Sequence, residues 1–288
     1  MQQIVYTNSS GESVTLMPSR PLILQSIEGT GSVKNNIHTS KSPDQDGNTV
    51  IGKDLDSREL VINGSIGANT DTDIMNYRRQ LVKAFNPKEK GVLTYSYDGG
   101  EKAINCEVED APVFPKRDGF YQTFSITLLC PNPFWQDLEL LKAEIAAWIG
   151  DFSFPLEITE IGIEMGHREP SLIVNTLNSG DVECGMRVEF KALATLTNPS
   201  ILNVNTQEFI KINKTMVAGE VLTITTHFGA KRVESVLNGV TTNAFNYIDL
   251  DSTFLQLDVG DNLFRYDADI NLDNLEVSIY YTPQYLGV

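Results

Sequence analysis

Residues 47–54 come nearest to a chemical motif in this 288-residue sequence, since they approach the pattern of a phosphate-binding loop. The last position of such a loop must offer a hydroxyl group to Mg²⁺, and Asp54 stands there instead. A polar stretch precedes the segment, and the apolar residues from Leu60 to Ile62 after it are typical of a strand rather than a helix. We therefore expect a loop here, and no nucleotide site.

The three histidines, His38, His167 and His227, provide neither a zinc site nor a catalytic base with a nucleophile. None has a second histidine near it in the sequence, and no G-x-S-x-G motif is present. Acidic residues are so frequent that no single pair of carboxylates can be assigned to glycoside hydrolysis. We predict no catalytic residue and no enzymatic activity.

Asp267, Asp269 and Asp273 lie near Asn271 and Asn274, and oxygen atoms from such residues are the ligands that calcium prefers. The spacing of an EF-hand, with glycine at its sixth position, is missing. A solvated acidic loop is the simpler interpretation. The sequence therefore predicts no metal ion and no cofactor.

Composition limits the partners and the compartment. The chain has 38 acidic and 22 basic residues, a net charge of −16, which disfavours nucleic acid and anionic membranes as partners. The cysteines, Cys106, Cys130 and Cys184, are odd in number and widely spaced, which predicts buried free thiols. Because neither a signal peptide nor a long apolar stretch is visible, we expect synthesis and folding in a cytoplasm.

The first half of the sequence has strand patterns and one helix pattern. Thr70 and Asp73 form a capping box, and apolar residues at helical spacing then continue to Phe85. The residues around this helix predict an opening hairpin over 4–16 and strands over 60–66, 91–97, 102–109 and 120–129. Residues 35–52 are polar and rich in turn formers, which predicts a long exposed loop that is functional or ordered by a partner.

The stretch Cys130-Pro131-Asn132-Pro133-Phe134-Trp135 divides the chain, because two prolines stop the strand before it. Apolar residues three to four apart then predict a short helix over 137–149. From residue 152 onward, short strands alternate with turn clusters, which is typical of a sandwich or jelly roll. We predict an N-terminal domain over 1–135, a helical connector over 136–151 and a C-terminal domain over 152–288.

The long strand that ends in C-P-N-P-F-W resembles the distal tail protein family of long-tailed, siphovirus-type bacteriophages. The second half carries further matching segments: Phe152-Ser153-Phe154-Pro155-Leu156, Asn178-Ser179-Gly180-Asp181 with Gly185, Gly219-Glu220-Val221-Leu222-Thr223-Ile224, and Leu255-Gln256-Leu257-Asp258-Val259-Gly260-Asp261-Asn262. The resemblance implies a mainly β protein. Its N-terminal ring domain would be a β-sandwich or split barrel with one helix, and its C-terminal domain a galectin-like β-sandwich of the jelly-roll type.

The resemblance also implies a structural role in the virion, at the tail tip or baseplate, after assembly in the host cytoplasm. The N-terminal domain would form a homohexameric ring through its strands and the helix at residues 70–85. This ring would join the tail tube protein to the tail-tip hub, or tail-associated, protein. The C-terminal domain would carry the receptor-binding protein.

An alternative function is carbohydrate binding at the host surface by the C-terminal sandwich. Sugar sites favour an exposed aromatic ring, but Trp135 and Trp148 lie at the predicted domain junction. The remaining candidates are Tyr247, Tyr266, Tyr280, Tyr281 and Tyr285. Aromatic residues in strands are mostly part of a core or a sheet face. A third alternative, a wall hydrolase of the tail tip, disagrees with the missing catalytic motifs.

Overall fold

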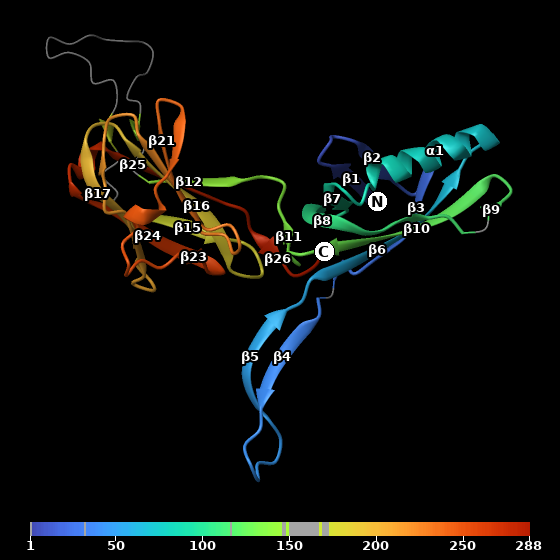
Figure 1. The fold of residues 1–288 in the computed structure, drawn as a ribbon, viewed down its shortest axis with the longest axis horizontal. Helices are drawn as coiled ribbons and strands as arrows, with labels where there is room; N and C mark the ends of the chain where they lie inside the picture. The colour runs from blue at the N-terminus through green and yellow to red at the C-terminus, as the bar shows by residue number, and fades with distance from the viewer. Residues whose placement is uncertain (1, 32, 116, 146–147, 150–166, 169–172) are drawn as a thin grey trace. The chain divides into compact units, whose positions relative to one another are not determined.

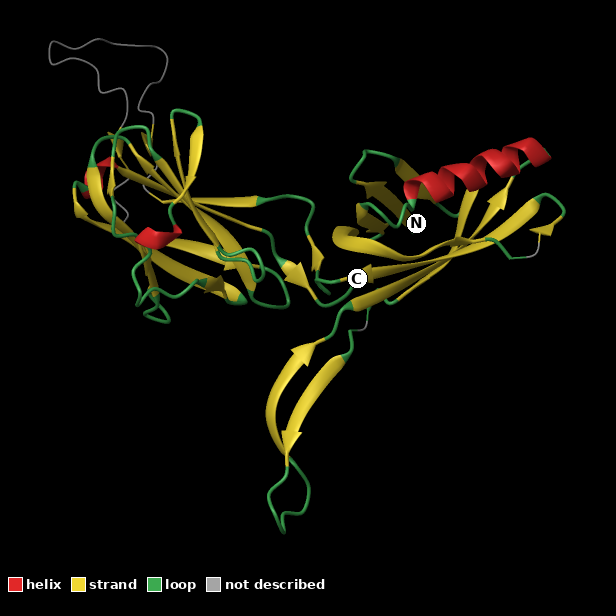
Figure 2. Cartoon of the chain, in the orientation of Figure 1, coloured by secondary structure: helices red, strands yellow, loops and turns green. Residues whose placement is uncertain are grey.

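The computed structural model describes residues 2–31, 33–115, 117–145, 148–149, 167–168 and 173–288. The chain divides into unit 1, formed by Met1–Leu138 and Gln284–Val288, and unit 2, formed by Glu139–Pro283. Strands dominate both units, and the described residues contain one α-helix, α1 (Figures 1 and 2). This confirms the mainly β fold. No helix in the described ranges has the length and apolar character needed to span a bilayer.

An antiparallel sheet forms the frame of unit 1. Its strands follow the order β2 (Ser13–Leu16), β1 (Gln3–Asn8), β7 (Lys90–Tyr97), β8 (Gly100–Val113), β10 (Tyr121–Cys130), β6 (Arg58–Gly67) and β3 (Leu22–Glu28). The short strand β9 (Arg117–Asp118) pairs with β10, and β11 (Trp135–Gln136) pairs with β8 and with β26 (Gln284–Tyr285). The alternation predicted for β10 is confirmed, because Phe124, Ile126 and Leu128 are all buried.

The helix α1 (Asp71–Ala84) covers one face of this sheet (Figure 1). Its N-terminus is the predicted capping box, in which the Thr70 hydroxyl accepts from the Asp73 amide at 3.2 Å and donates to the Asp73 carboxylate at 2.6 Å. Leu81 is buried, and Phe85, directly after the helix, stacks on Tyr6 of β1 with ring centroids 4.2 Å apart. The capping box and the spacing of apolar residues therefore predict the same helix that the packing against the sheet stabilises.

Residues 35–52 do not form the predicted loop. They contain β4 (Asn35–Ser40) and the first part of β5 (Thr49–Leu55), which pair antiparallel as a separate two-stranded hairpin. The alternation that marks a half-buried strand is missing, because nearly every side chain on both faces of the hairpin is exposed. Backbone hydrogen bonds hold this ladder, and the side-chain pattern does not reveal them.

The helix predicted over residues 137–149 is wrong, and so is the helical character of the connector at 136–151. Leu141–Ile145 form β12, which pairs with β25 (Leu275–Tyr281), and Trp148–Ile149 form β13, which pairs with β14 (His167–Arg168). Leu141 and Ala143 pack against the core of unit 2 in a two-residue period that the three-to-four spacing concealed. The segment 152–158 of the predicted second domain lies outside the described residues.

Unit 2 is a sandwich of two antiparallel sheets. The first has the order β12, β25, β16 (Cys184–Ala192), β20 (Val221–Thr225), β21 (Arg232–Leu237) and β22 (Val240–Asn243), with β23 (Gln256–Leu257) beside β16. The second has the order β15 (Ile173–Asn178), β24 (Gly260–Ile270), β17 (Leu196–Asn203) and β18 (Phe209–Lys211), with β19 (Thr215–Met216) beside β17. Phe190 and Ile279 of the first sheet share one core with Ile201 and Phe264 of the second. Two 3₁₀ turns, η1 (Phe245–Tyr247) and η2 (Leu272–Asn274), complete the described part of unit 2.

Candidate functional site

The root of the β4–β5 hairpin is built around Arg58, the first residue of β6, which is only 1% exposed. Its Nε donates to the carbonyl of Pro133 at 2.7 Å, and its Nη2 donates to the carbonyl of Leu286 at 2.5 Å. Its Nη1 donates to the carbonyls of Gly29 and Thr30, the latter at 3.1 Å. A planar guanidinium has enough donors to join several backbone segments at once. Arg58 therefore links the start of the hairpin arm to two segments that are distant in sequence.

Trp135 completes this root. Its ring is fully buried, its Nε1 donates to the carbonyl of Thr30 at 3.0 Å, and the guanidinium carbon of Arg58 lies 5.9 Å from its ring centroid. The backbone amide of Val288 also donates to the Thr30 carbonyl, at 3.2 Å. The C-P-N-P-F-W stretch and the last residues of the chain thus hold one side of the hairpin root.

The role of Arg58 was not predicted from the sequence. One signal was present: Arg58 shares the two-residue period of Leu60 and Ile62, so it belongs to the inward face of β6. A charged residue at an inward position requires polar partners. Burial lowers the pKa of Arg58 from its ordinary value. The carbonyl oxygens that accept hydrogen bonds from its guanidinium group stabilise the charged form.

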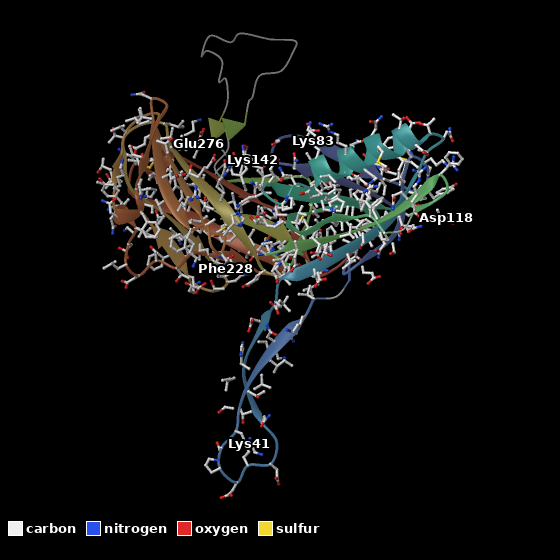
Figure 3. All side chains as sticks on the ribbon, turned by 45° about the vertical axis from the view of Figure 1, so that its right-hand side comes forward. Lys41, Lys83, Asp118, Lys142, Phe228 and Glu276 are labelled. Carbon is white, nitrogen blue, oxygen red and sulfur yellow. The ribbon has the colours of Figure 1, made fainter. Side chains whose placement is uncertain are left out.

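The hairpin itself exposes apolar side chains without a core to cover them. Ile51 is 69% exposed, and Ile37 and Val50 are each more than half exposed. Both strands of the hairpin lead away from the sheet of unit 1 (Figure 1), and Lys41 marks its far end (Figure 3). A two-stranded hairpin is at best marginally stable alone, and exposed β-branched residues on it indicate a surface for another molecule.

Polar contacts along the hairpin are exposed and therefore weak. Lys34 and Asp56 form an ion pair at 3.2 Å near the root, and Asp54 contacts both His38 and Asn36. The hydrogen bond from His38 is the largest of the effects that lower the pKa of Asp54. Because water screens exposed pairs, these contacts align the two strands but contribute little stability. A rigid root with a weakly stabilised arm fits an element that is completed by a neighbour.

A second exposed apolar surface of unit 1 lies on α1. Met75 and Val82 are each about half exposed, and their separation of seven residues places them on one face of the helix. Ile74 and Leu81, one position earlier in each case, are buried against the sheet. The hairpin and the outward side of α1 are therefore two separate places in unit 1 where apolar side chains are exposed.

The residues considered for chemistry do not come together. Residues 47–54 form the end of the hairpin turn and most of β5, so no helix N-terminus faces a phosphate position. His38 lies on the hairpin and His227 in unit 2, while the side chain of His167 is outside the described residues. Asp269 is engaged by Lys211 at 2.9 Å and by Asn198 at 2.8 Å. Within the ranges that the structure describes, no three His, Cys, Asp or Glu residues are grouped to hold a metal ion.

The cysteines are free and buried, as predicted.

Two asparagines from the matching segments of the second half close turns. Asn178 donates to the carbonyls of Val182 and Leu257 at 2.9 and 3.1 Å, and Asn262 donates to those of Asp258 and Gly260 at 2.8 and 3.0 Å. Their side chains therefore stabilise the sandwich.

Comparison with known proteins gives consistent matches over both units. The phage tail protein RIFT-related domain matches residues 9–130, and the C-terminal domain of the siphovirus-type tail component matches residues 179–285. No curated protein matches the sequence significantly.

Solved structures show the same fold. The crystal structure of the SPP1 Dit (gp 19.1) protein, described as a paradigm of the hub adsorption apparatus in phages that infect Gram-positive bacteria, is similar with a TM-score of 0.71 and 12% identity, over 98% of this chain and 99% of that one. A chain of the phage p2 baseplate in its activated conformation with Sr is similar with a TM-score of 0.55 and 11% identity, over 100% of both chains. The same baseplate with Ca gives a TM-score of 0.55 and 11% identity, over 100% of this chain and 99% of that one.

Proposed function

Because the chain belongs to the distal tail protein family of siphovirus-type phages, we propose that it forms a homohexameric ring at the tail tip. The β4–β5 hairpin is the observation that carries this proposal. The hairpin and α1 are different surfaces of unit 1, so a contact between the hairpin of one copy and α1 of the next would be head-to-tail. Head-to-tail contacts that close produce rings.

The buried root explains how a thin hairpin would act as a defined contact. Arg58 and Trp135 hold Gly29 and Thr30 to the body of unit 1, so the arm begins from a fixed position. A fixed starting position reduces the entropy lost when the arm binds a neighbour. The exposed Ile37, Val50 and Ile51 would then be buried between copies.

The ring would join the tail tube protein on one side to the tail-tip hub protein on the other. Unit 2 would carry the receptor-binding protein, and the particle would be assembled in the host cytoplasm. Membership of a structural tail family supports these roles. Repeated contacts between protein surfaces require neither a cofactor nor a catalytic residue. We accordingly propose that the protein has no enzymatic activity.

The mass of the purified protein in solution tests the ring. We expect light scattering at several concentrations to give six times the chain mass, and negative-stain images to show rings with an open centre. The same measurement is repeated after mixing with purified tail tube protein, because a neighbouring protein can act as a template for the ring. A protein that stays monomeric both alone and with the tail tube protein would contradict the proposal.

Carbohydrate binding by unit 2 is a second candidate function, and the position of Tyr247 favours it. Of the five candidate tyrosines, Tyr266 and Tyr281 are buried and Tyr285 belongs to unit 1. Tyr280 lies under Arg187, whose guanidinium carbon is 4.4 Å from its ring centroid. Tyr247 is partly exposed and borders a cavity.

A further inference from the structure

A cavity of about 540 Å³ lies in unit 2 where the turn before β20 meets the β21–β22 hairpin. This volume falls within the range of small-molecule sites, about 300–1,000 Å³. Seven polar or aromatic residues supply the lining that could recognise a ligand: Lys214, Thr215, Glu220, Ser235, Thr242, Asn243 and Tyr247. The cavity therefore combines hydrogen-bonding groups with one aromatic ring.

Glu220 is a buried carboxylate at this cavity, with 2% of its surface exposed. Its Oε1 accepts from Lys214 and, at 2.5 Å, from Ser235, while its Oε2 accepts from the backbone amide of Val217 at 3.1 Å. Burial alone would raise the pKa of Glu220, but these hydrogen bonds outweigh it and leave the pKa below its ordinary value. The carboxylate is thus ionised at neutral pH, and it fixes the Lys214 and Ser235 side chains at the wall of the cavity.

Tyr247 forms an aromatic wall of the cavity. It is 39% exposed, and its backbone is fixed on both sides: its carbonyl accepts from the Asn213 amide at 2.7 Å, and its amide donates to the Ala244 carbonyl at 3.0 Å. The Lys214 ammonium lies 5.9 Å from the ring centroid. An aromatic ring that is positioned before binding can stack on a flat apolar face of a ligand with little loss of entropy.

The remaining polar groups include both donors and acceptors. The Asn243 side-chain oxygen accepts from the amide of Phe245 at 2.8 Å, which fixes the side chain and leaves its amide nitrogen to donate. The hydroxyl of Thr242 donates to the Ser235 carbonyl at 3.4 Å and keeps acceptor capacity. The single lysine and single glutamate among the lining residues neutralise each other, so the cavity has no net charge to attract an anion.

We propose that this cavity binds a neutral saccharide of one or two pyranose rings. The Tyr247 ring stacks on the C–H face of one pyranose, the exposed Thr242 hydroxyl accepts from a sugar hydroxyl, and Asn243 donates to another. A pyranose has an apolar face and hydroxyl groups that both donate and accept, which matches this lining. The proposal gives the carbohydrate-binding candidate a defined site and does not depend on the ring.

Saturation-transfer NMR with the full-length protein tests the site. The probes are methyl glycosides of glucose, galactose and N-acetylglucosamine, with glycerol phosphate as an anionic comparison. Each is used at up to about 10 mM, which saturates a site of millimolar affinity. We expect at least one neutral glycoside to bind and glycerol phosphate not to bind.

Two variants connect the binding to the cavity. Tyr247→Ala should lower the affinity about two- to twelvefold, because a stacked aromatic contact is worth about 0.5–1.5 kcal/mol beyond its buried area. Asn243→Ala should also weaken binding. Tyr280→Ala is the matched control, since Tyr280 is a partly exposed tyrosine of unit 2 outside the cavity lining, and it should bind as the unchanged protein does.

The proposal fails if no neutral glycoside binds, if only glycerol phosphate binds, or if both cavity variants bind like the unchanged protein. Light scattering on the same samples measures the oligomeric state, so a loss of saccharide binding can be distinguished from a loss of the ring. A Tyr247→Ala protein that forms the same oligomer as the unchanged protein but does not bind the saccharide supports the site. If Tyr247→Ala loses both the oligomer and saccharide binding, the variant has a general folding defect. The binding of saccharide to Asn243→Ala then decides whether the cavity is the site.

Discussion

The guanidinium Nε of Arg58 donates to the carbonyl of Pro133 at 2.7 Å, although the two residues are 75 positions apart. Pro133 belongs to the stretch that ends the last long strand of unit 1, and Arg58 immediately follows the hairpin arm. This contact holds the residue that follows the hairpin to the C-P-N-P-F-W stretch.

Replacing Arg58 should destabilise unit 1. Arg58→Ala removes the donor to the buried Pro133 carbonyl and to the partly buried carbonyls of Gly29 and Leu286, and one unsatisfied buried group costs about 1–3 kcal/mol, so we expect a loss of about that size. Arg58→Lys should rescue little, because an ammonium cannot reproduce the planar arrangement of donors. Urea unfolding measures the change. Arg79→Ala, at an exposed position of α1, is the control and should change stability by less than about 0.5 kcal/mol.

Removing the last five residues, Gln284–Val288, should loosen the hairpin root while leaving unit 2 folded. The deletion takes away the Leu286 carbonyl bonded by Arg58, the Val288 amide bonded to Thr30, and the pairing of β26 with Trp135. Hydrogen exchange should become faster in β11 and at the start of β6, but stay unchanged in β24. Equal exchange in both proteins would show that the C-terminal strand does not support unit 1.

A charge on the hairpin should prevent ring formation without unfolding the protein. Ile51→Asp places a carboxylate at the most exposed apolar position of the arm, where a neighbouring copy would bury it unpaired. We expect light scattering to show monomers and circular dichroism to show an unchanged fold. Leu250→Asp, which alters a 98% exposed residue of unit 2, is the control and should keep the oligomer. An Ile51→Asp ring as stable as the original would exclude this surface.

Gly185 should not tolerate a side chain. A Cβ atom there would lie 2.5 Å from Nδ1 and 2.7 Å from Cα of His227, so backbone would have to move. We expect Gly185→Ala to cost about 1–3 kcal/mol, the usual range for overpacking. Thermal unfolding compares it with Gly31→Ala, where the added atom meets nothing within 4 Å and φ is not positive. Equal melting temperatures for the two variants would contradict the close approach seen at Gly185.

The buried carboxylate of Glu220 should make unit 2 sensitive to acid. Its folded-state pKa lies below the ordinary value of 4.5, so its stabilising contribution is complete above pH 4.5 and is lost as the pH falls through the lower, folded-state pKa. The stability difference between the unchanged protein and Glu220→Gln should therefore shrink on acidification below pH 4.5. A difference that stays constant across this range would show that Glu220 does not titrate with a lowered pKa.

Local sequence determined the elements whose hydrogen bonds and packing are local. The capping box at Thr70 and Asp73 predicts α1, because both partners lie within one helical turn. The two-residue alternation predicts β10, because one face of that strand is buried along its whole length. The family resemblance likewise depended on short segments whose residues close turns, such as Asn178 and Asn262.

Tertiary structure decided the elements whose partners are distant in sequence. Leu141 becomes part of a strand because β25, more than 130 residues later, offers a ladder for its backbone, and this pairing overrides helical spacing. Arg58 acquires its role only when Gly29, Pro133 and Leu286 meet around it. The cavity beside Tyr247 likewise requires β22 to fold back on β21. Spacing along a chain reports neighbours within a few residues, whereas these contacts depend on how the whole chain closes.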